Sequence, residues 1–232
     1  MCGHSATPGL QPGTPSTGSG SSDRDGLRAY VPNTPICIAA FDLAASALPL
    51  TIVHHSLRVY LFAKWLAEKE EMTEWLKLNN EMLFVACICH DLGASERYNG
   101  PQRFEVEGAD AAADLLRAFQ RSESEVHEVW TAIALHTSPG IAERITRLAR
   151  LVRNGVLIDF RPAIRAAVEA VDYGITVEDA LPRLEIEKVL GDAVVEQAIQ
   201  TPDTKAPAAS WPGILYRSYC DDPTWTGVNR AF

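Results

Sequence analysis

The chain has 232 residues, which is enough for one domain with extensions or at most two small domains. Its hydrophobic fraction of 47% is typical of a globular protein with a buried core, and no segment reaches the roughly 18 consecutive apolar residues of a membrane span. The formal net charge of -9 gives a surface that repels phosphate backbones, which disfavours nucleic acid as a partner. We therefore expect a soluble cytoplasmic protein with a small-molecule substrate and no membrane partner.

Residues 1–26 are rich in Ser, Gly, Thr and Pro, which predicts a disordered tail because such a segment buries too little apolar surface to fold. The segment lacks the apolar run of a signal peptide and is too poor in arginine for a transit peptide. The five cysteines are odd in number, and Cys87 and Cys89 lie in an apolar run, so we expect free thiols rather than a disulfide framework.

Residues 27–200 show apolar residues at helical spacing and little alternating strand pattern, which predicts an all-α domain. One helix is predicted to stop at Asn154-Gly155, and the apolar segment after it holds a single acid, Asp159. Residues 201–232 are punctuated by Pro and Trp, and we expect an irregular tail whose aromatic side chains pack on the domain or on a partner subunit. The predicted helices cover residues 38–46, 51–70, 79–92, 106–120, 123–136, 141–154, 162–172 and 183–200.

The segment 84–93 is apolar or cysteine up to position 89 and then places His90 and Asp91 before Leu92-Gly93. An element that is apolar all round is buried, and a buried charge is costly unless it is paired or binds a metal. A helix end at Gly93 would let two adjacent side chains reach one ion. For the dipeptide alone, a capping aspartate beside a core histidine is the commoner arrangement. Evidence for a metal site therefore has to come from the rest of the chain.

Other residues of metal-ligand type lie on elements that the pattern places against the core. His54 and His55 open the helix over 51–70, and periodicity leaves open which of them points inward; His136 ends another helix. Two histidines and two carboxylates suit a divalent ion such as Zn, Mn, Fe or Mg. Such an ion lowers the pKa of bound water toward neutrality, and Asp91 or a nearby histidine can then move the proton.

The ordered set of these residues resembles the H…HD…D pattern of the HD superfamily of metal-dependent enzymes. The segments 103–109 and 135–144 are similar to the cyanamide hydratase-like branch of that superfamily. The resemblance implies an HD-domain helical bundle with the metal site in its core and zinc as the favoured ion. It selects His55 over His54, because the family's histidine directly precedes a Ser-x-Arg sequence. The implied metal ligands are His55, His90, Asp91 and Asp159, with Asp172 as the fallback for the last of them.

The resemblance also gives His136 a place facing the substrate or a second ion, so Asp91 and His136 are the candidate catalytic residues. Thr137, next to it, is a candidate substrate contact, with a helix cap as the alternative. Arg58 is expected to pair with a core carboxylate and His127 to face solvent.

The predicted function is the hydration of cyanamide or a related nitrile to a urea-type product by metal-activated water. A nucleotide or phosphate-ester phosphohydrolase is the first alternative, for which only Arg97, Arg103 and Arg144 are candidates to hold phosphate. An HD-fold interaction module without turnover is the second. The aromatic side chains of residues 201–232 could also form subunit contacts, so a homo-oligomer is a further possibility.

Overall fold

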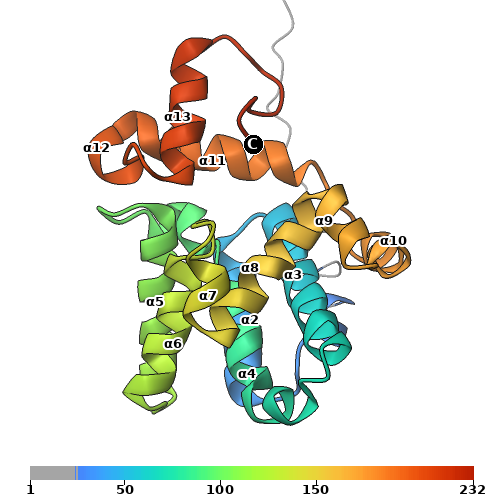
Figure 1. Ribbon diagram of the computed structural model, residues 1–232. Helices are drawn as coiled ribbons and strands as arrows, with labels where there is room; N and C mark the ends of the chain where they lie inside the picture. Colours follow the sequence, from blue (N-terminus) through green and yellow to red (C-terminus); the bar gives the residue numbers. More distant parts are fainter. Residues whose placement is uncertain (1–23, 25) are drawn as a thin grey trace, which may run out of the picture.

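The computed structural model describes residue 24 and residues 26–232, so the predicted disordered tail lies almost wholly outside the described residues. In the described part of the chain the regular structure is entirely helical, as predicted (Figure 1). None of these helices has both the length and the apolar character needed to cross a bilayer. The elements are η1 (Arg28–Tyr30), α2 (Pro35–Ala47), α3 (Leu50–Lys69), α4 (Thr73–Cys89), η2 (Leu92–Ala94), η3 (Glu96–Tyr98), α5 (Phe104–Ala118), α6 (Glu123–Ala134), α7 (Ala142–Ile145), α8 (Arg147–Phe160), α9 (Pro162–Ala167), α10 (Val171–Ala180), α11 (Ile186–Gln200), α12 (Pro202–Lys205) and α13 (Trp211–Asp221).

The core of the molecule is a helical bundle in which α3 packs against α4 and α8, and α6 packs against α4, α5 and α8. Phenylalanines from four different helices are almost completely buried in it: Phe41, Phe62, Phe84 and Phe104. Burying these apolar faces against one another drives the assembly. The same packing buries polar residues of α3 and α8, together with His90 and Asp91, which directly follow α4.

The prediction that a helix stops at Asn154-Gly155 is wrong, because α8 continues through both residues to Phe160. Gly155 faces α3, where an added Cβ would lie 2.6 Å from the carbonyl oxygen of Val59. The glycine is therefore a point of close helix approach rather than a helix terminator. As a result Asp159 lies in the last turn of α8, facing α3, instead of in a separate apolar segment after the helix.

Replacing Gly155 by alanine is expected to lower the free energy of unfolding by about 1–3 kcal/mol, since the methyl group would push α3 and α8 apart. Urea-induced unfolding followed by circular dichroism measures this change. Gly26→Ala is the control, because a Cβ at Gly26 meets nothing within 4 Å and should change stability by less than about 0.5 kcal/mol. A Gly155→Ala variant as stable as the wild type would contradict the close packing.

The C-terminal part of the chain is more regular than predicted. Residues 201–232 contain α12 and α13, and Ser210 caps α13 by accepting a hydrogen bond from the Gly213 amide at 3.1 Å. The predicted helix over 162–172 is divided into α9 and α10. Figure 1 shows α11, α12 and α13 lying across one end of the bundle, where they cover the ends of α3, α5 and α8. We call residues 186–232 the C-terminal cap.

Candidate metal centre

Three buried side chains meet where α3 passes the C-terminal end of α4. His55 comes from α3, while His90 and Asp91 directly follow the last residue of α4, and none of the three is more than 1% exposed. The Nε2 atoms of His55 and His90 lie 3.2 Å apart. Oδ2 of Asp91 lies 3.2 Å from Nε2 of His90 and 3.6 Å from Nε2 of His55.

The turn after His90 and Asp91 is held by the start of α5. A Cβ on Gly93 would collide with the backbone carbonyl of Phe104, so only glycine allows this approach. The end of α4 at Cys89 frees both side chains from helical spacing, and they can then face the same point. The predicted helix over residues 79–92 begins too late and ends too late, because α4 runs from Thr73 to Cys89. The expectation that His90 and Asp91 lie at a helix end and face a common point is consistent with this geometry.

The three side chains fit one divalent cation. Two atoms bound tetrahedrally to an ion at bond lengths of about 2.0–2.1 Å lie roughly 3.3–3.4 Å apart, close to the distances found here. His55, His90 and Asp91 each offer a ligand atom within 4.8 Å of the others. Both carboxylate oxygens of Asp91 are buried and lack a hydrogen-bond partner among the described residues, a costly arrangement that a cation would relieve.

The histidines of this region all turn Nε2 toward the centre, because their Nδ1 atoms are occupied elsewhere. Nδ1 of His90 contacts the carbonyl oxygen of Cys87 at 2.7 Å, and Nδ1 of His136 contacts that of Ile133 at 2.7 Å. Nδ1 of His55 lies 2.7 Å from Oδ2 of Asp159. A carbonyl or carboxylate partner requires Nδ1 to donate, which leaves the Nε2 lone pair free to bind a metal or a proton.

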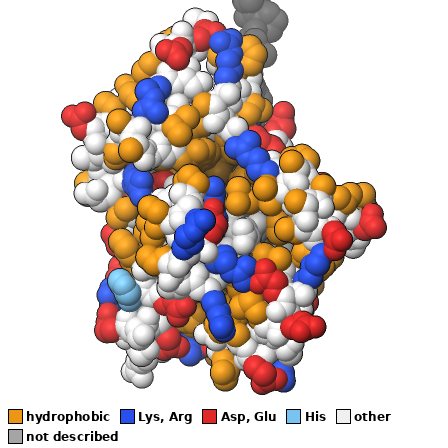
Figure 2. Space-filling model, in the orientation of Figure 1, with side chains coloured by type: hydrophobic (Ala, Val, Ile, Leu, Met, Phe, Trp, Pro, Cys, Tyr) orange, Lys and Arg blue, Asp and Glu red, His pale blue; other side chains and the backbone are white. Residues whose placement is uncertain are grey.

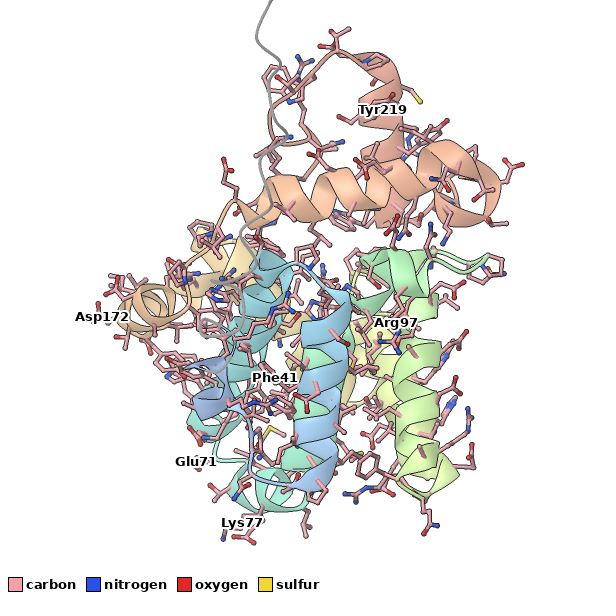
Figure 3. All side chains as sticks on the ribbon, turned by 180° about the vertical axis from the view of Figure 1, so that it is seen from behind. Phe41, Glu71, Lys77, Arg97, Asp172 and Tyr219 are labelled. Carbon is pink, nitrogen blue, oxygen red and sulfur yellow. The ribbon has the colours of Figure 1, made fainter. Side chains whose placement is uncertain are left out.

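Asp159 lies behind His55 and is not part of the three-residue cluster. Its two oxygens accept hydrogen bonds from Nε and Nη2 of Arg58, each at 2.8 Å, and one also contacts His55. The expected pairing of Arg58 with a core carboxylate is thereby confirmed. Asp159 thus orients His55 in this structure, and its direct ligation of a metal remains a prediction. Asp172, the fallback, is exposed on α10, at the outer edge of the molecule (Figure 3).

His136 and Thr137 follow α6 and reach the same centre from another side. Nε2 of His136 lies 3.7 Å from Oδ1 of Asp91, and the side chain is 2% exposed. Thr137 donates its hydroxyl hydrogen to Oε1 of Glu105 at 2.7 Å, and it does not cap the following helix, whose N-cap is Ile141. The helix-cap alternative for Thr137 is therefore wrong.

Comparison with known families agrees with this geometry. Residues 52–154 match the family model of the HD domain. The HD-domain segment includes His55, the His90-Asp91 pair and His136, and it ends before Asp159. Residues 52–154 are thus similar to the HD domain, and the buried cluster within them is of a kind that could hold a divalent metal ion. The match is to the HD domain as a whole and singles out no branch of the superfamily.

One curated relative is an uncharacterized protein of Clostridium beijerinckii, which is 24% identical to this chain over 102 residues. The alignment covers 43% of this chain and 65% of that protein, so this chain spans slightly less than two thirds of the relative's length.

Electrostatics distinguish the ionisable groups of the candidate metal centre. Burial, reinforced by the nearby His90, lowers the pKa of His136 to about 3, so this imidazole is neutral near pH 7. Burial opposes ionisation of Asp91, but His90, His55 and His136 outweigh it and lower the pKa of Asp91 below its ordinary value. As for His136, burial lowers the pKa of His55, here against the opposing effect of Asp159. For His90, Asp91 outweighs burial and raises the pKa of the imidazole, so a cation that binds Nε2 of His90 has to displace a proton from it.

Glu105 is a residue that the sequence analysis did not single out as functional. It is fully buried at the start of α5, and burial raises its pKa against the opposing influence of Arg103 and Thr137. Its Oε2 atom has no hydrogen-bond partner among the described residues. In the sequence, Glu105 stands between Phe104 and Val106 at the start of a predicted helix, and an acid between two apolar residues there is expected to be buried. This pattern could have identified Glu105 as a candidate functional residue.

A cavity of about 550 Å³ opens onto the candidate metal centre. His55, His90, Asp91 and His136 form its polar floor, and the C-terminal cap supplies much of the opposite wall. Figure 2 shows a hollow with hydrophobic side chains inside and Lys or Arg side chains near its edge. The arginines that line the cavity are Arg153, Arg161 and Arg217, not the Arg97, Arg103 and Arg144 considered from sequence. Among the latter, Arg97 lies outside on η3 near the start of α5 (Figure 3).

Proposed function

We propose that this protein is a metal-dependent enzyme of the HD type that adds water to a small organic substrate in the cavity. The proposal rests on one observation above all: His55, His90 and Asp91 converge at metal-ligand spacing, and both oxygens of the buried Asp91 lack a hydrogen-bond partner among the described residues. Nitrogen and oxygen ligands of this kind suit zinc first, with Mn, Fe or Mg as alternatives. A bound ion of this type supplies a water nucleophile at neutral pH, because it lowers the pKa of its water ligand.

The protein's own residues have separable roles in this proposal. His55, His90 and Asp91 hold the ion, and Asp159 keeps the His55 ring in the orientation that points Nε2 inward. His136 lines the cavity with its Nε2 atom 3.7 Å from Oδ1 of Asp91, and it orients the substrate nitrogen and relays a proton from the attacking water to it. Thr137 has its hydroxyl hydrogen committed to Glu105, so its oxygen is left to accept a hydrogen bond from a substrate N–H group.

The reaction proposed first is hydration of cyanamide or a related nitrile to a urea-type product. The water oxygen bonds to the nitrile carbon, and the water protons end on the former nitrile nitrogen through His136. Support comes from the two segments that resemble the cyanamide hydratase-like branch, 103–109 and 135–144. These segments lie together beside the cavity, where Glu105 from one and Thr137 from the other share a hydrogen bond.

A phosphate-ester phosphohydrolase is the second candidate, favoured by the arginines on the cavity. Arg153 is engaged by Glu143 at 3.3 Å and by the carbonyl oxygen of His136 at 3.0 Å. Arg161 and Arg217 form no ion pair with a carboxylate in the described part of the chain. Two arginines without carboxylate partners can bind an anionic group.

The test is turnover by zinc-loaded protein: urea produced from cyanamide and inorganic phosphate released from nucleotide monophosphates. We expect urea formation in the wild type and a loss of about a hundredfold or more in His136→Ala, which removes the proton acceptor while leaving the three metal-holding residues in place. Phosphate release without urea would select the phosphohydrolase. A full metal complement without either product would contradict both reactions and favour the interaction module.

A further inference from the structure

The cavity is far larger than the smallest substrate considered above. Cyanamide has three non-hydrogen atoms and occupies on the order of 60 Å³, taking ~30 Å³ for a water-sized volume. The cavity holds about 550 Å³, a volume within the range of sites that bind drug-sized molecules. A cavity of this size over a reacting centre is suited to a substrate with a substantial body besides its reacting group.

The walls between the floor and the opening are apolar and aromatic. Phe160 from α8 stands beside His55, with ring centres 4.5 Å apart. Phe232 packs against Phe160 and Trp211 with ring centres 5.0 and 5.4 Å away, so the three rings form one continuous surface. Gly191 on α11 allows this approach, because an added Cβ would lie 3.3 Å from the Phe232 ring. Such a surface gains free energy by covering an apolar or aromatic group.

The outer edge of the cavity is basic. Arg161 and Arg217 line the cavity and are exposed. Ile141 and Ile214, which also line it, are 55% and 45% exposed, so this part of the lining lies at the opening. Arg217 donates to the carbonyl oxygen of Ala208 at 2.8 Å, which holds its guanidinium near the opening. On a chain with a net charge of -9, two cations without carboxylate partners at one opening are a local reversal of sign. Low-dielectric walls strengthen the attraction of such a site for an anion.

We propose that the cavity binds an organic substrate in an extended orientation: its reacting group at the histidine-aspartate floor, an aromatic or alkyl body against Phe160, Trp211 and Phe232, and an anionic end at Arg161 and Arg217. This proposal rests on the proposed function, since it takes the floor as the reacting end. It assigns substrate selection to the C-terminal cap and to Arg161, all of which lie outside the HD-domain match. It also places the anion at the opening, whereas a phosphate-ester substrate would place its anion at the floor.

Binding of a probe series tests this orientation directly. The probes are 4-phenylbutyrate, its neutral amide and butyrate, titrated calorimetrically into zinc-loaded protein. We expect the acid to bind about fivefold more tightly than the amide, and butyrate to bind at least tenfold more weakly than the acid. The double variant Arg161→Gln/Arg217→Gln should remove the advantage of the acid and leave the amide unchanged, and Trp211→Ala should weaken both aromatic probes about tenfold.

Matched controls separate this site from general effects. Arg117→Gln removes a positive charge from an exposed arginine of α5 that does not line the cavity, and Trp225→Ala removes an exposed tryptophan outside it. Neither should change binding. The acid should also bind the His90→Ala variant within about twofold of the wild type, because its carboxylate is predicted to contact the rim and not the metal.

Several outcomes would overturn the proposal. Equal binding of acid and amide to the wild type would contradict it. It would also be contradicted if His90→Ala lost acid binding while the arginine double variant kept acid binding. Absence of binding by protein that still holds its zinc would reject the proposed orientation and leave the metal-dependent activity intact. Absence of zinc from the wild type would instead reject the proposed function. The same titrations into metal-free protein would then still measure whether the aromatic wall and the two arginines bind the acid.

Discussion

Replacing His90 by alanine is expected to reduce bound zinc from about one ion per chain to less than a tenth of that value. His90 supplies one of three converging ligand atoms, and its Nε2 lies 3.2 Å from both neighbouring ligand atoms. Two remaining ligands hold a divalent ion far more weakly than three, because each lost bond must be replaced by water. Elemental analysis of protein purified without chelators gives the stoichiometry directly.

The control for His90→Ala is His127→Ala, since His127 is exposed on α6 as predicted and has no part in the cluster. Asp91→Asn should lose zinc as His90→Ala does, whereas Asp172→Asn should retain it, because Asp172 lies exposed on α10. Equal and negligible zinc in the wild type and all four variants would reject the metal centre. The His90-Asp91 pair would then be structural.

The Arg58→Met substitution is expected to lower the free energy of unfolding of the metal-free protein by about 3–5 kcal/mol. Arg58 is completely buried and binds Asp159 through two hydrogen bonds of 2.8 Å. It also donates to the carbonyl oxygens of Leu181 and Pro182, each at 3.1 Å, which ties the segment after α10 to α3. Methionine fills a similar volume but leaves the Asp159 carboxylate in a buried position with much of its charge compensation removed.

Chemical unfolding in the presence of a chelator measures the Arg58→Met effect without any contribution from bound metal. Lys64→Met is the control on the same helix, because Lys64 forms a surface ion pair with Glu68 that should contribute less than about 1 kcal/mol. The double variant Arg58→Met/Asp159→Leu should be more stable than Arg58→Met alone, since it removes the buried charge together with its partner. A double variant less stable than either single variant would show that the pair is not the source of the effect.

Local sequence patterns predicted the secondary structure best where a helix keeps one apolar face. The helices around residues 51–70, 106–120 and 123–136 were located within a few residues of α3, α5 and α6. The pattern failed at Gly155, where a glycine was interpreted as a helix end although it serves the contact with Val59. It failed again in residues 201–232, where Pro and Trp suggested irregular structure but α13 begins with that very pair, Trp211-Pro212. Proline is tolerated in the first turn of a helix, so its presence alone could not distinguish a helix start from an irregular segment.

The sequence by itself determined the helical fold class, the buried position of His90 and Asp91, and the likeness to the HD superfamily that joined them with His55 and His136. These follow from residue type, spacing and order, which are local properties of the chain. Only the tertiary structure decided that Asp159 faces His55 and Arg58, that Glu105 meets Thr137, and that Arg161, Arg217 and the aromatic residues of the C-terminal cap surround one cavity. Those contacts join residues far apart in the chain, and they depend on how helices pack, which no periodicity within a single helix encodes.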